Sequence, residues 1–108
     1  MEANRVVAEI TVVPLGTGKP GVSEYVAACV KVLGKRKGIN YRLTPMGTIL
    51  EGTMDEIISV AREMHEVPFK KGALRVTTTL KIDDRRDKLL TMEGKISSVR
   101  KRMPSVKT

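Results

Sequence analysis

The chain has 108 residues, of which 41% are hydrophobic, and its net charge is +8 from 20 Lys and Arg against 12 Asp and Glu. This length suggests one domain over residues 1–108, and the patterned apolar segments exclude a disordered chain. One cysteine excludes an intrachain disulfide, and with a single histidine it cannot form the usual structural zinc site, so we expect no metal and no cofactor. We find no signal-peptide pattern and no apolar run long enough to span a bilayer, so we expect a cytoplasmic protein without a membrane partner.

The basic residues are unevenly placed. They gather at residues 35–37, at Lys70 and Lys71, and along the last predicted helix to Lys107. Cations at helix ends complement the helix dipole, which favours a solvated surface as their explanation. Nucleic-acid binding is the alternative, because a basic surface attracts polyanions.

In the first part of the chain, residues 5–14 alternate in the manner of a strand. The face with Val6 and Ile10 is wholly apolar, whereas the face with Glu9 and Thr11 is mixed. A glycine-rich loop over 15–21 precedes a helix predicted over 22–37. Its apolar stripe includes Cys29, which we interpret as a small core residue and not as a reactive thiol.

The middle of the chain predicts a hairpin and a second helix. Strands over 41–44 and 48–52 flank a turn for which Pro45 and Gly47 are suited. Thr53 and Glu56 form a capping box for a helix that we expect to end near residues 67–68.

The last part predicts a strand over 74–83, with Thr77 and Thr79 on one face, and a third helix over 87–103. The apolar stripe of that helix should pack on the core or on a neighbouring subunit. It consists of Leu89, Met92, Ile96, Val99 and Met103.

The order βαββαβ, followed by a terminal helix, predicts a ferredoxin-like α+β plait. Right-handed crossovers place the first two helices on one face of a four-stranded antiparallel sheet, with the first and third strands as central neighbours. The other face then carries Glu9, Thr11, Thr77 and Thr79. Its polar groups need partners, either from a ligand or from a second chain.

Three blocks of the chain carry a family resemblance: EITVVPLGT in the first strand, TPMGTILEG in the hairpin, and TTLKIDDRRD before the last helix. Together they resemble the YkoF-like, thiamine-binding family of small ferredoxin-like proteins. The resemblance implies single plaits or tandem pairs, with a homotetramer for the single type. It also implies a ligand, thiamine or its hydroxymethylpyrimidine portion, that is bound without an established reaction.

The hairpin block matches the family at Thr48 and Glu51. An aminopyrimidine and a cationic thiazolium require hydroxyls, a carboxylate and an apolar wall, so Thr11, Thr48, Glu9 and Glu51 are the predicted ligand residues. Met46 and Tyr41 are candidate wall residues. Thr48 and Glu51 are an odd number of residues apart, so a regular strand cannot point both to one face. Glu51 is therefore either a ligand residue or a structural one.

Other classes of function are less well supported by the sequence. No nucleophile with a paired base and no metal set is present, and residues 16–19 lack the full phosphate-loop pattern, so we do not expect an enzyme. Asp83, Asp84 and Asp87 could hold a cation, although pairing with the neighbouring arginines is the commoner arrangement. RNA-recognition domains share the plait but stack bases on aromatics, of which the last strand has none. A structural or regulatory oligomer without thiamine is the remaining alternative.

Overall fold

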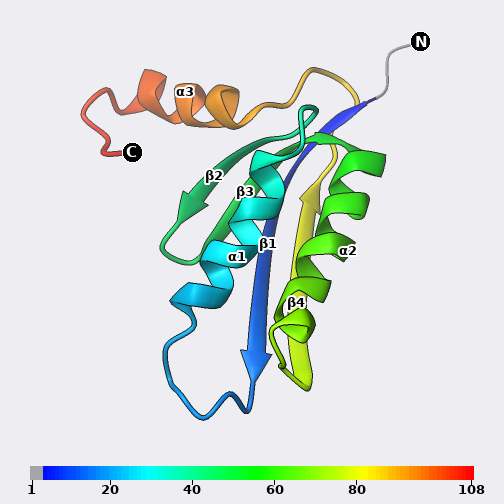
Figure 1. Cartoon of the computed structure of the whole chain (residues 1–108). Coiled ribbons are helices and arrows are strands. Elements are labelled where there is room, and N and C mark those ends of the chain that lie inside the picture. The colour runs from blue at the N-terminus through cyan, green and yellow to red at the C-terminus, as the bar shows by residue number, and fades with distance from the viewer. Residues whose placement is uncertain (1–3) are drawn as a thin grey trace.

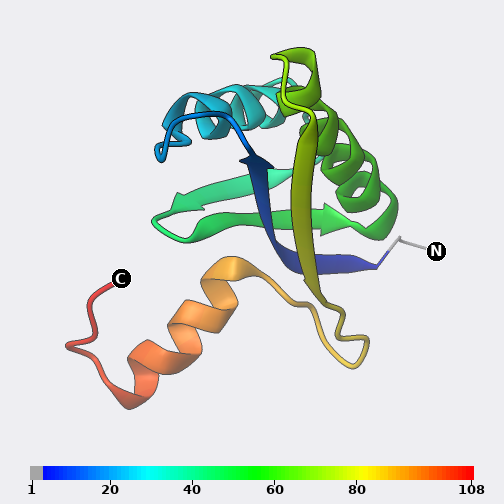
Figure 2. The ribbon, with the colours of Figure 1, turned by 90° about the horizontal axis from the view of Figure 1, so that it is seen from below.

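A four-stranded antiparallel sheet in the order β2-β3-β1-β4 forms the centre of the protein. The computed structural model describes residues 4–108. The strands are β1 (Arg5–Leu15), β2 (Asn40–Thr44), β3 (Gly47–Thr53) and β4 (Arg75–Asp83). Helices α1 (Ser23–Gly34) and α2 (Met54–Lys70) lie on one side of the sheet, and α3 (Met92–Arg102) lies on the other (Figure 1, Figure 2). The predicted ferredoxin-like α+β fold is confirmed.

The hydrophobic core lies between the sheet and the helices α1 and α2. Alternation along β1 turns Val6, Ala8 and Ile10 toward these helices, and all three are buried. Ile10 pairs with Thr48 and Ala8 pairs with Leu50, so both β3 residues share the helix-facing side. Burying a side chain such as Leu50 contributes about 1.5–3 kcal/mol, which fixes the register of the sheet.

The opposite side of the sheet, here called the open face, carries the other alternate residues. Across the β1–β4 pair, Glu9 lies beside Lys81, Thr11 beside Thr79 and Val13 beside Thr77. Across the β1–β3 pair, Val7 lies beside Glu51 and Glu9 beside Ile49. The predicted placement of Glu9, Thr11, Thr77 and Thr79 on one face is therefore confirmed.

Helix α2 continues beyond its predicted end, through Pro68 to Lys70. Pro68 has no N–H to donate to the carbonyl of Met64 one turn earlier. That carbonyl accepts a hydrogen bond from the Cys29 Sγ of α1, at 3.5 Å. Burial raises the pKa of the Cys29 thiol, so it stays protonated as this bond requires. The interpretation of Cys29 as a core residue is confirmed.

Helix α3 departs most from the prediction, because it begins at Met92 and not at residue 87. Residues 84–91 form a loop in which Arg86 pairs with Asp84 at 2.9 Å and Arg85 pairs with Asp87 at 2.5 Å. Thr91 then caps the helix by accepting from the Gly94 N–H. No α3 residue is buried, so its stripe does not pack on the core, and packing on a neighbouring subunit, the other predicted alternative, stays a prediction.

The capping box of α2 is present as predicted, and it allows a stability test. The Glu56 carboxylate accepts from the Thr53 N–H at 3.0 Å, while the Thr53 hydroxyl accepts from the Glu56 N–H at 3.3 Å. Thr53→Ala should lower the free energy of unfolding by about 1 kcal/mol. Urea unfolding at pH 7 measures this, with the exposed Ser97→Ala as the control.

The same box should make stability depend on pH. Hydrogen bonds from Thr53 lower the pKa of Glu56. The contribution of Glu56 to the free energy of unfolding is therefore present above the pKa that Glu56 has in the unfolded chain. It is lost as the pH falls through the lower pKa that Glu56 has in the folded protein. The difference between Thr53→Ala and wild type should shrink in acid. A difference that grows in acid would contradict this account.

Candidate functional site

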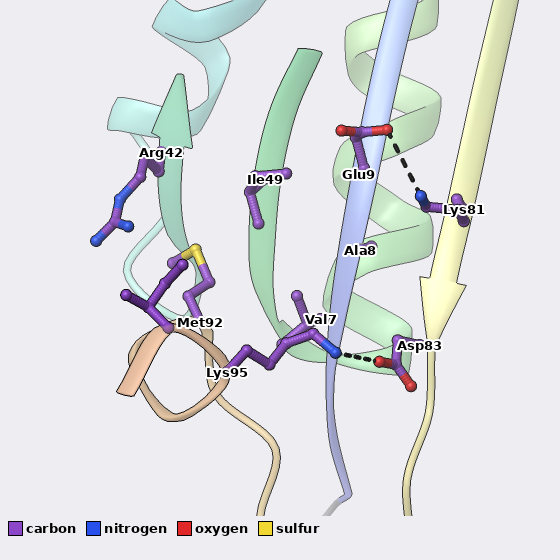
Figure 3. A pocket seen from close by; sticks show the side chains of 10 residues that line it. Val7, Ala8, Glu9, Arg42, Ile49, Lys81, Asp83, Met92 and Lys95 are labelled. Atoms are coloured by element: carbon purple, nitrogen blue, oxygen red, sulfur yellow. Dashed lines mark hydrogen bonds and ion pairs between the residues drawn. The ribbon is translucent and has the colours of Figure 1, made fainter. Parts of the chain in front are cut away.

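The first candidate site, here called the open-face cavity, lies between the open face and the first turn of α3 and has a volume of about 340 Å³ (Figure 3). Strands β1, β2, β3 and β4 each contribute to it. Its lining consists of Val7, Ala8, Glu9, Arg42, Ile49, Lys81, Asp83, Met92, Lys95 and Ile96. The volume lies within the range typical of small-molecule sites.

Charged groups surround an apolar floor in this cavity. Lys95 pairs with Asp83 at 2.6 Å, and Arg42 pairs with Glu93. Figure 3 shows Glu9 facing Lys81, but their charged atoms are 4.0 Å apart. Glu9 therefore has the carboxylate least engaged by neighbouring cations, and it lies beside Val7 and Ile49.

Both carboxylate oxygens of Glu51, on the same face, accept hydrogen bonds. One carboxylate oxygen accepts from the Met92 N–H at 2.8 Å, and the other accepts from the Asn40 Nδ2 at 3.1 Å. Arg5 approaches the second oxygen at 3.8 Å, and Glu51 is only 8% exposed. These contacts hold the first turn of α3 against the sheet. Of the two roles left open by the sequence, the contacts of Glu51 support the structural one.

Thr48 lies on the other side of the sheet from Glu9 and Glu51, among helix-facing residues. It lines a second space, here called the hairpin cavity, of about 190 Å³. This cavity lies between α1, the second half of β1 and the β2–β3 hairpin, with one residue of α2. Its lining consists of Ile10, Thr11, Val12, Val13, Val22, Val26, Cys29, Leu43, Thr44, Pro45, Met46, Gly47, Thr48 and Met64.

The four predicted residues thus do not form one site. Glu9 lines the open-face cavity, Glu51 positions α3, and Thr11 and Thr48 border the hairpin cavity. Of the two candidate wall residues, Met46 borders the hairpin cavity. Tyr41 lies on the helix-facing side of β2 and lines neither cavity.

Gly47 was expected to serve the turn, but it lies in β3 without a positive φ. A Cβ at this position would lie 3.0 Å from Thr11 Cγ2 and 3.3 Å from Glu9 Cγ. The glycine is therefore explained by close approach to β1 on the open face, and its missing side chain leaves room beside Glu9.

Several lining residues were not predicted as site residues. Lys81 and Asp83 follow Thr77 and Thr79 on the same strand face, so continuing that alternation would have found them. Met92 and Lys95 come from α3, whose position on the open face has no signal in the sequence pattern.

Other kinds of site find little support in residues 4–108. No group of three or more His, Cys, Asp or Glu side chains there is placed to hold a metal ion, and Asp84 and Asp87 pair with arginines. No helix in this part of the chain is both long and apolar enough to cross a bilayer. None of the aromatic residues Tyr25, Tyr41 and Phe69 lies on the open face, where base stacking would need them.

Comparison with known proteins agrees with this architecture. The chain is 46% identical over 100 residues to the UPF0045 protein YqgV of Bacillus subtilis, covering 90% of this chain and 96% of that protein. Its fold matches a crystal structure of MJ1052 from Methanocaldococcus jannaschii with a TM-score of 0.81 and 38% identity, over 89% of this chain and 96% of that one.

A third similar structure, from Thermotoga maritima, has a name that connects it to thiamine biosynthesis or salvage. It matches with a TM-score of 0.72 and 26% identity, over 89% of this chain and 99% of that one. The model of the thiamine-binding protein family matches residues 8–100. The chain therefore belongs to the thiamine-binding protein family.

Proposed function

We propose that the protein binds thiamine, or its aminopyrimidine portion, in the open-face cavity and releases it unchanged. Family membership supports the class of ligand. The observation that carries the choice of cavity is the Glu9 carboxylate, which lies beside an apolar floor with only a 4.0 Å cationic neighbour.

The chemistry of the cavity suits such a ligand. A carboxylate accepts from the exocyclic amine of an aminopyrimidine and also favours the cationic thiazolium. Val7, Ile49 and Ile96 offer an apolar surface to the rings. The lining contains no Cys, Ser, Thr or Tyr nucleophile and no His to act as its base, which favours binding without reaction.

Calorimetric titration with thiamine tests the proposal directly. We expect saturable binding of thiamine and weaker or absent binding of unrelated cationic heterocycles. Chemical-shift changes in NMR spectra should map to Glu9, Ile49 and Met92. Thiamine that fails to bind, or that shifts only residues away from this cavity, would refute the proposal.

We further propose that copies of the chain associate through the open face and α3, as a homotetramer or at least a dimer. Val13 and Leu15 on the open face are each 38% exposed, and Val99 of α3 and Met103, which follows the helix, are about half exposed. Figure 2 shows α3 extending away from the sheet, where a second copy could cover its stripe. A structural oligomer without thiamine would share these contacts and differ only in the titration above.

Sedimentation at micromolar concentration checks the assembly. We expect a species of two or four times 11.9 kDa, because exposed apolar side chains on a sheet face favour association. A single species of 11.9 kDa at all concentrations would contradict the assembly without affecting the ligand proposal.

A further inference from the structure

We propose that the outer side of α3 binds the phosphate backbone of a nucleic-acid duplex, whatever its base sequence. The surface is a groove of about 620 Å³ between α3 and the loop that precedes it, here called the α3 groove. Its basic and serine residues are Arg85, Lys88, Lys95, Lys101, Ser97 and Ser98. The proposal does not depend on thiamine binding, because of these residues only Lys95 also lines the open-face cavity.

Positive charge is concentrated in this part of the chain. Residues 85–108 hold eight of the 20 Lys and Arg but two of the 12 Asp and Glu, so they carry +6 of the net charge of +8. The helix dipole accounts for cations in the last turn of α3. It does not account for Arg85 and Lys88, which lie in the loop, or for Lys95 in the first turn, where the dipole disfavours a cation. Such a concentration of charge attracts a polyanion.

Two of the four basic residues are available to an added anion. No carboxylate lines the α3 groove. Arg85 and Lys95 already pair with aspartates, at 2.5 and 2.6 Å. Lys88 and Lys101 are exposed and form no ion pair with a carboxylate of residues 4–108. These two lysines are therefore expected to make the main phosphate contacts.

The helix face in the groove allows a backbone to approach closely. Residues at spacings of three and four share this face, and they are Gly94, Ser97, Ser98 and Lys101. The Ser98 hydroxyl donates to the Gly94 carbonyl at 3.0 Å, which leaves the exposed Ser97 hydroxyl to donate to a phosphate oxygen. Met92 and Ile96 point the other way, into the open-face cavity. A second copy seated on their side of α3 would leave the groove open.

The character of the groove favours a duplex over a single strand or a membrane. Proteins bind single strands by stacking bases on aromatic side chains, and residues 84–108 contain no aromatic residue. A membrane-binding helix presents its apolar face to the lipid, whereas the groove is a hollow on the face with short polar side chains. Binding through the phosphates of a duplex requires only cations and hydroxyl groups.

Fluorescence anisotropy with two labelled DNA duplexes of unrelated sequence tests the proposal. Both duplexes should bind with the same affinity, because phosphate contacts carry no sequence information. We expect micromolar binding at about 50 mM salt, with log K falling against log salt at a slope of about −2 to −4, since each phosphate contact contributes about −0.9. A single strand of the same sequence should bind more weakly.

The double variant Lys88→Gln/Lys101→Gln removes the two unpaired cations. It should bind a duplex about 25- to 100-fold more weakly at about 100 mM salt, with a slope flatter by about 2. Lys70→Gln/Lys71→Gln is the matched control, because it removes the same charge at the C-terminal end of α2, at the other end of the molecule from α3 (Figure 1). The control should bind within about threefold of wild type, because distant surface charges are screened by salt.

Three results would overturn the proposal. The first is the absence of saturable duplex binding at about 50 mM salt. The second is equal weakening in the two double variants, which would show a response to total charge and not to the groove. The third is binding to vesicles of phosphatidylserine and phosphatidylcholine as tight as to the duplexes, which would identify a membrane surface. Thiamine titration stays independent, because neither Lys88 nor Lys101 lines the open-face cavity.

Discussion

Glu9→Gln should weaken thiamine binding about ten- to a hundredfold. Glutamine keeps the size of the side chain but removes the negative charge that faces the amine and the thiazolium. A hydrogen bond to a charged group is worth about 1.5–3 kcal/mol, and each 1.4 kcal/mol changes affinity about tenfold. Calorimetric titration of both proteins measures the difference.

The control for this variant is Glu24→Gln, which removes a carboxylate from the exposed surface of α1. It should bind thiamine as the wild type does. Protein stability should change little in Glu9→Gln, because the only ion pair of Glu9 among the described residues has charged atoms 4.0 Å apart. Equal affinities for wild type and Glu9→Gln would remove Glu9 from the site.

Glu51→Ala should release the first turn of α3 from the sheet. The Met92 N–H and the Asn40 amide both lose their acceptor, at a cost of about 1–3 kcal/mol for each group that stays buried. We expect lower stability in urea, smaller species in sedimentation and weaker thiamine binding, because α3 supplies Met92, Lys95 and Ile96 to the open-face cavity.

Limited trypsin digestion gives a local readout of this change. Arg100, Lys101 and Arg102 lie in α3, and cleavage there should accelerate once the helix is released. Glu51→Gln retains one acceptor oxygen and should show an intermediate effect. Deleting residues 91–108 should reproduce the loss of assembly. A Glu51→Ala protein with unchanged assembly and digestion would show that Glu51 does not hold α3.

The strands and helices whose apolar residues alternate or repeat regularly were determined by the sequence itself. In residues 5–15 and 75–83 successive side chains point to opposite faces of the strand. A shift of the strand pairing by one residue would expose Val6 and Ile10 to water, so the pattern determines which face each side chain takes. The capping box at Thr53 is equally local, because both of its partners lie within one helical turn. The order of the elements then restricted the topology to the plait.

The composition of the sites was decided by the tertiary structure. Because Thr48 and Glu51 are an odd number of residues apart, the sequence alone showed that they face opposite sides of the sheet. Only the packing of α1 and α3 placed a cavity on each side. The first turn of α3 is tied to the sheet by a buried carboxylate that accepts from Met92, 41 residues along the chain, and by the pairs Lys95–Asp83 and Arg42–Glu93, and no local pattern encodes such contacts. The need for a glycine at position 47 likewise arises from the close approach of Thr11 on the neighbouring strand. Local periodicity thus determined the elements and their faces, whereas long-range contacts decided which side chains share a cavity.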